Sequence, residues 1–199
     1  MNTARDLALV ALDAAPDRPV EQGDLSLALA GAEILDLVEA KALVLDGERI
    51  LPSAQAPTGD RLLDEATAAL MRQEPYESVE DWLWRRGRGL ATAYVDDLER
   101  VGLTTRGRGR RLRMRTWRTE PVDSAARRRA TERLAQAEPV LTALAAAAGV
   151  RDEPTGQDVD DEAVTTVLAA VGDSVMELEA VRQRRQIEDA AFDNVWRGY

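Results

Sequence analysis

The chain contains no cysteine and no histidine. Their absence excludes disulfide frameworks, thiolate nucleophiles and Ser-His or Cys-His dyads, and it excludes most zinc sites. It also removes the commonest general base. We therefore expect a protein that is not an enzyme and that holds neither a metal ion nor a cofactor.

Aromatic residues are scarce, with four Trp, three Tyr and one Phe among 199 residues, although hydrophobic residues make up 45% of the chain. The core must therefore be built mainly from Leu, Val and Ala, which is the composition of packed helices. A chain of this length can bury one sizeable core and need not form two. The composition predicts a mainly α protein, a single helical-bundle domain over residues 1–199.

Long apolar runs are missing as well. Residues 7–12 are followed at once by Asp13 and lack the basic start of a signal peptide. The longest stretch of low polarity, residues 140–150, is far shorter than the ~20 residues that span a bilayer. We expect a cytoplasmic protein that meets membranes only peripherally.

Lysine is almost absent, since Lys41 is the one lysine among 26 basic residues, and the others are arginine. This ratio and the abundant alanine indicate a GC-rich bacterial genome. The chain is acidic, at net −10, yet residues 85–133 carry 15 arginines and six acidic residues, a local net charge of +9. Such a region attracts polyanions. The alternative is that these arginines pair with the protein's own excess of carboxylates.

Apolar periodicity and turn residues predict the order of the elements. A helix after residue 60 has Thr58 or Asp60 as its cap, a short helix has Ser78, and Ser174 is expected to cap another. Pro139 is expected to kink a long helix. Helices are expected at residues 3–13, within 25–45, at 61–73, 91–102, 123–148, 160–171 and 173–186, and in a last segment that reaches Trp196.

Two β-hairpins are expected, at residues 43–52 with a turn at Asp46-Gly47, and at residues 103–118 with a turn around Gly107 and Gly109. In the second arm of this hairpin, successive side chains point to opposite faces of the strand. One face is apolar, and the other can contact lipid phosphates at the membrane interface. The residues of that second face are Arg111, Arg113, Arg115 and Trp117.

A helix followed by an arginine-rich hairpin is also the layout of a winged-helix DNA regulator, in which the wing contacts phosphates. The helix before this hairpin carries Asp96, Asp97 and Glu99, which makes it a poor reader of the major groove. Membrane binding is therefore the preferred interpretation, and DNA binding is the alternative. Self-association is left open.

Several blocks of the sequence resemble the Golgi phosphoprotein 3 family, which includes eukaryotic Golgi adaptors and many actinobacterial proteins. The blocks are LALVALDA, GAEILDLVEAKALVLDGERI, APTGDRLLDEA, ESVEDWL and LERVGLTT, in that order along the chain. Beyond about Pro121 only the helical character is similar. The resemblance implies an actinobacterial member with a mostly helical fold.

The same resemblance implies that a basic pocket binds phosphatidylinositol 4-phosphate and that the hairpin of residues 103–118 meets the membrane. Arg85 and Arg88 have the spacing of two headgroup-binding arginines of the family. An arginine early on the second helix of the family has no counterpart, because Ala30 stands near its place, and residues 16–23 lack the family's loop tryptophan.

The hairpin interpretation predicts that Arg111, Arg113 and Arg115 together supply membrane affinity. Replacing all three with Glu should abolish flotation of the protein with anionic liposomes, because each arginine near such a surface contributes about 1 kcal/mol. Circular dichroism of the variant should match that of the unchanged protein. Unchanged flotation of the folded variant would refute the assignment.

Overall fold

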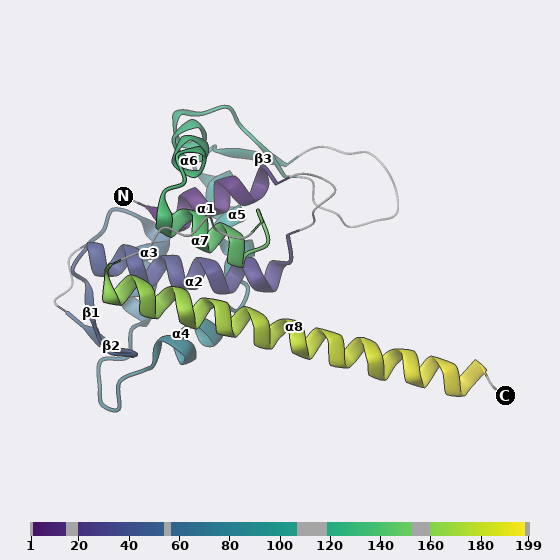
Figure 1. Cartoon of the computed structure of the whole chain (residues 1–199). Helices are drawn as coiled ribbons and strands as arrows, with labels where there is room; N and C mark the ends of the chain where they lie inside the picture. Colours follow the sequence, from purple (N-terminus) through teal and green to yellow (C-terminus); the bar gives the residue numbers. More distant parts are fainter. Residues whose placement is uncertain (1, 15–19, 54–56, 107–118, 153–159, 198–199) are drawn as a thin grey trace.

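The structure is a computed structural model that describes residues 2–14, 20–53, 57–106, 119–152 and 160–197. Its architecture is mainly α, which confirms the predicted fold class (Figure 1). No helix in this part of the chain is long and apolar enough to cross a membrane. The described helices are α1 (Thr3–Leu12), α2 (Gln22–Glu39), α3 (Arg61–Ala69), α4 (Val79–Arg86), α5 (Leu90–Arg100), α6 (Ala125–Ala135), α7 (Pro139–Ala147) and α8 (Glu162–Arg197).

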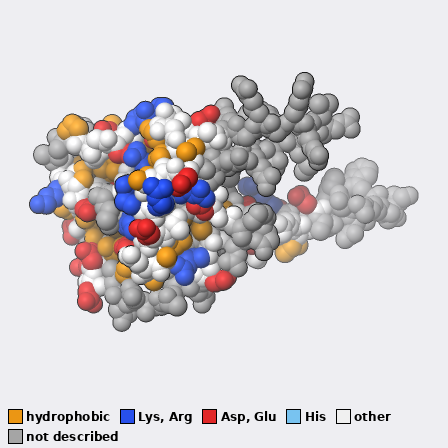
Figure 2. All heavy atoms as spheres, turned by 90° about the horizontal axis from the view of Figure 1, so that it is seen from above, with side chains coloured by type: hydrophobic (Ala, Val, Ile, Leu, Met, Phe, Trp, Pro, Cys, Tyr) orange, Lys and Arg blue, Asp and Glu red, His pale blue; other side chains and the backbone are white. Residues whose placement is uncertain are grey.

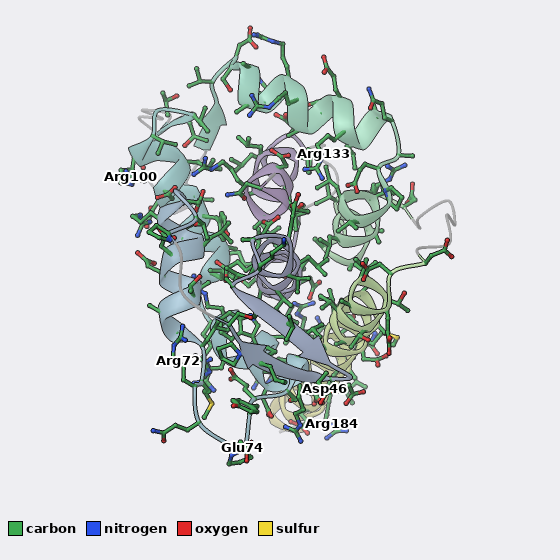
Figure 3. All side chains as sticks on the ribbon, turned by 90° about the vertical axis from the view of Figure 1, so that its left-hand side faces the viewer. Asp46, Arg72, Glu74, Arg100, Arg133 and Arg184 are labelled. Carbon is green, nitrogen blue, oxygen red and sulfur yellow. The ribbon has the colours of Figure 1, made fainter. Side chains whose placement is uncertain are left out.

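Helix α2 lies in the middle of the bundle and contacts α1, α3, α4, α5, α7 and α8 (Figure 3). Every residue from Ser26 to Leu37 is buried. An amphipathic helix needs cover on one face only, whereas a helix that is buried on every side must be covered by other elements on every side. The sequence of α2 therefore determines where the other helices pack.

The predicted helix starts are confirmed at two caps. The side chain of Asp60 accepts hydrogen bonds from the backbone N–H groups of Leu62 and Leu63 at the start of α3, and Ser78 accepts one from Asp81 at the start of α4. Each cap satisfies backbone donors that have no partner within the helix.

The first hairpin is confirmed as strands β1 (Leu43–Asp46) and β2 (Arg49–Pro52), with Gly47 at φ +56° in the turn. The second hairpin begins where predicted, but its first strand pairs beyond the predicted second arm, whose residues lie outside the described part of the chain. Strand β3 (Thr104–Arg106) pairs with β4 (Thr119–Pro121), so that Arg106 lies opposite Thr119. A turn at Gly107 and Gly109 would have placed a residue near 110 there. The backbone N–H of Val122 also donates to Leu103 O, which extends this pairing toward α6.

Two further expectations about the C-terminal half are wrong. The helix predicted at 123–148 is two helices, because Glu138 caps α7, Pro139 is its first residue, and Ala137 has φ +53° between them. Conversely, the segments predicted to be separate after residue 160 form the one helix α8, which continues through Gly172. Ser174 lies inside α8 with its hydroxyl buried, so it caps no helix.

Helix α8 packs closely on α2 at Gly31. A Cβ atom added at Gly31 would lie 2.5 Å from Cγ2 of Val171 and 3.4 Å from Cγ1 of Val167. Valine cannot move aside easily, because its β-branched side chain has one strongly preferred rotamer in a helix. The absence of a side chain at Gly31 therefore sets the distance between the two helices.

This close approach predicts opposite effects for two Gly→Ala substitutions. Gly31→Ala should lower the free energy of unfolding by about 1–3 kcal/mol, because it overpacks the core. Gly172→Ala should raise it by about 0.5–1 kcal/mol, because a Cβ at Gly172 meets no atom within 4 Å and alanine favours a helix. Urea unfolding followed by circular dichroism measures both, and equal effects would contradict the packing described.

Candidate functional site

A buried ion pair fixes the geometry around the candidate site. Glu33 of α2 is fully buried, and its carboxylate accepts two hydrogen bonds from Arg86 of α4, from Nε at 2.7 Å and from Nη2 at 2.9 Å. The hydroxyl of Tyr94 of α5 donates to the same carboxylate at 3.2 Å. Burial raises the pKa of Glu33, and the bonds from Arg86 and Tyr94 oppose that shift. Three helices are thus held by one charged group.

The turn between α4 and α5 lies next to this pair and consists of Gly87, Arg88 and Gly89. A Cβ on Gly87 would lie 2.5 Å from the carbonyl oxygen of Leu83, and Gly89 has φ +73°, so both positions require glycine. The backbone N–H of Ala91 then donates to Ser26 Oγ at 3.1 Å, which ties the start of α5 to α2. The turn is tightly constrained, and Arg88 is its one exposed long side chain.

A cavity of about 240 Å³ opens beside this turn. Its lining comes from the first turns of α2, the α4–α5 turn and the inner face of α8, and it includes Gln22, Ser26, Trp84, Arg88, Thr92 and Leu178. No side chain caps the start of α2, so the backbone donors of its first turn give that end a partial positive charge. Arg88 pairs with no carboxylate in the described part of the chain. The site combines an available guanidinium, a helix N-terminus and an indole.

Arg85, the other predicted headgroup ligand, is placed differently. Its guanidinium makes two bonds with the buried carboxylate of Glu77, at 2.6 and 2.7 Å, and donates to the carbonyl of Ala69. It also lies 5.1 Å from the ring centre of Trp82, a cation–π arrangement. Arg85 does not line the cavity beside Arg88. A shared role for the two arginines stays a prediction.

The predicted membrane-contact residues Arg111, Arg113, Arg115 and Trp117 lie outside the described residues. The base of their hairpin is described, and β3 packs on α5 while β4 packs on α1. Helix α5 begins beside Arg88 and ends beside β3, and its 11 residues span about 16 Å at 1.5 Å per residue. The cavity and the hairpin base therefore lie at opposite ends of α5.

Many other arginines pair with carboxylates of the protein itself. Arg127 and Arg133 of α6 bond Asp13 and Asp6 of α1, and Arg182 of α8 bonds Asp24 of α2. Basic and acidic side chains accordingly mix on the face that carries α6 (Figure 2). The alternative interpretation of the basic region therefore holds for Arg127 and Arg133, while Arg88 and Arg129 have no such partner among the described residues.

Several residues of the cavity were not predicted from the sequence. Gln22 and Ser26 carry no motif, and Leu178 was placed on a separate short helix, so its contact with α2 could not be foreseen. The glycines on both sides of Arg88 were the one local signal, because a Gly-Arg-Gly turn exposes the side chain between them.

A comparison with protein families finds that the model described as Golgi phosphoprotein 3 (GPP34) matches residues 4–188. No curated protein sequence matches the chain. The family match extends from α1 into α8, so it includes every element that lines the cavity.

The buried ion pair predicts a large stability difference between two glutamates. Glu33→Ala should lower the free energy of unfolding by about 3–5 kcal/mol, because it leaves the charge of Arg86 largely buried without its carboxylate partner. The control Glu65→Ala removes the exposed partner of Arg61 and should cost less than about 1 kcal/mol. Urea unfolding of both variants measures the difference, and similar losses would show that the buried pair does not hold the helices together.

Proposed function

We propose that this chain, which belongs to the Golgi phosphoprotein 3 family, is a non-catalytic peripheral membrane protein. It would bind anionic phospholipid headgroups. Phosphatidylinositol 4-phosphate is the headgroup that the family resemblance implies. The protein would work at the cytoplasmic face of a membrane. The observation that supports this most is the position of Arg88, exposed and unpaired among the described residues, on the rim of a cavity with a helix N-terminus.

The chemistry of that rim suits a phosphate ester. A guanidinium can donate two parallel hydrogen bonds to phosphate oxygens, and a helix N-terminus adds backbone donors and a favourable dipole. Trp84 supplies an indole, a group that settles at the boundary between water and lipid. Together they would bind a headgroup that projects from a bilayer.

The site differs from the family pattern in ways that affect its strength. Ala30 stands near the place of the early arginine, and Arg85 would have to leave Glu77 before it could contact a phosphate. Arg88 would therefore carry most of the directed contact. The arginines of residues 104–118 would supply charge attraction that does not depend on headgroup geometry.

The proposal predicts that Arg88→Lys lowers the preference for phosphatidylinositol 4-phosphate over phosphatidylglycerol at equal membrane charge, by about tenfold. Lysine keeps the charge but loses the paired donors. Arg129→Lys is the matched control, since Arg129 is exposed and has no carboxylate partner among the described residues. Liposome flotation over a lipid series measures both variants.

Equal effects of the two substitutions, or no headgroup preference in the unchanged protein, would overturn the role of Arg88 and leave only general electrostatic attraction. Duplex DNA belongs in the same experiment. Tighter binding to DNA than to any liposome would overturn the membrane proposal and favour the regulator alternative.

A further inference from the structure

The outer face of α8 carries apolar side chains that no described residue covers. The inner face packs on the bundle through Val167, Val171 and Leu178. At successive helical turns on the opposite side lie Met176, Ala180, Gln183 and Ile187, all exposed, with Met176 at 65% and Ile187 at 69%. We call these four residues the outer stripe. Their spacing of four, three and four residues is the spacing of a helix–helix seam.

The second half of α8 also extends beyond the bundle (Figure 1). The last ion pair between α8 and another described element joins Arg182 to Asp24, at 2.7 Å, and residues 183–189 are all exposed. The helix continues to Arg197. A free helical segment of ~15 residues is only marginally stable in water, so a partner helix would stabilise it.

Charges beside the outer stripe complement each other. Glu177 and Arg184 are exposed, lie seven residues apart and therefore occupy the same edge of the stripe. Neither pairs with another group in the described part of the chain. By contrast, Arg182 on the inner side is bound to Asp24 and Glu179. Glu177 and Arg184 thus place an anion and a cation, both unpaired among the described residues, beside the same apolar stripe.

We propose that the outer stripe of α8 is a dimer interface that binds the same stripe of a second copy, with the two helices antiparallel. When two antiparallel helices are related by a two-fold axis, equal edges meet and each contact occurs twice. Aligning Met176 with Ile187 of the second copy places Ala180 opposite Gln183. The same alignment brings Glu177 within one turn of Arg184 of the second copy. Apolar matching and charge matching therefore select the same register.

A second copy fits this surface better than a membrane or an unrelated chain would. A membrane would gain little from Glu177, which an anionic surface repels. The stripe is narrow, and the polar side chain of Gln183 interrupts it. A second copy would place the short side chain of Ala180 opposite Gln183, so it leaves room for the glutamine. The bundle lies on the other face of α8, so it does not obstruct the approach. This interface is independent of the headgroup site and can fail without affecting that proposal.

Cysteine pairs test the register, because the chain has no cysteine of its own. Met176→Cys and Ile187→Cys are purified separately, mixed and exposed to mild oxidant. The mixture should form a disulfide-linked dimer, whereas either variant alone should not, because equal positions lie about 16 Å apart along an antiparallel pair. Crosslinking of Met176→Cys with itself, or none in the mixture, would overturn the proposal.

Charge exchange gives a second test of the interface, by sedimentation velocity over a hundredfold range of concentration. Glu177→Arg and Arg184→Glu should each weaken the dimer by about tenfold, and the variant with both changes should restore it, because the two charges exchange partners. Val181→Glu is a control off the stripe, at a side chain that is exposed to 38%, and it should have little effect. A monomeric unchanged protein, or no rescue in the double variant, would refute the contact. Loss of liposome flotation in Ile187→Glu with no change of mass would assign the stripe to lipid instead.

Discussion

The ion pair between Glu33 and Arg86 is the interaction on which the arrangement of the helices depends most directly. A carboxylate with no exposed surface is tolerated only when its lone pairs are satisfied, and here Arg86 and Tyr94 satisfy them from two different helices. The turn with Arg88 lies between those two helices. Its position relative to α2 is therefore determined by a charged group that never reaches the surface.

The arginines of this chain divide by what they contact. Arg85, Arg86, Arg127, Arg133 and Arg182 each bond a carboxylate on another segment of the chain, so they join elements and leave no free charge for a ligand. Arg88 does not. A count of arginines along the sequence therefore overestimates the positive charge available to a polyanion. The count does not distinguish arginines that pair with the protein's own carboxylates from arginines that remain unpaired.

The sequence was sufficient for whatever depended on local chemistry. Asp60 and Ser78 cap helices because their side chains accept backbone hydrogen bonds, and Asp46-Gly47 turns a hairpin because glycine accepts a positive φ. The sequence was not sufficient where contacts between distant segments determine the structure. Gly172 does not end α8, because α8 is supported by α2, α4 and α7 along its inner side. The pairing of Arg106 with Thr119 likewise depends on how β4 packs against α1.

Helix α8 connects the two proposals physically. Its inner face meets α2 at two glycines, Gly23 and Gly31, where an added Cβ would lie within 2.6 Å of Leu178 or 2.5 Å of Val171. Such close contact fixes the position of α8 on α2 as far as Arg182, so Met176 and Ala180 of the outer stripe keep a fixed relation to the wall of the cavity. A single copy with one directed arginine would bind a headgroup only modestly. Two copies joined by a two-fold axis perpendicular to the membrane would present two cavities to the same surface, and the second contact would then form at high effective concentration.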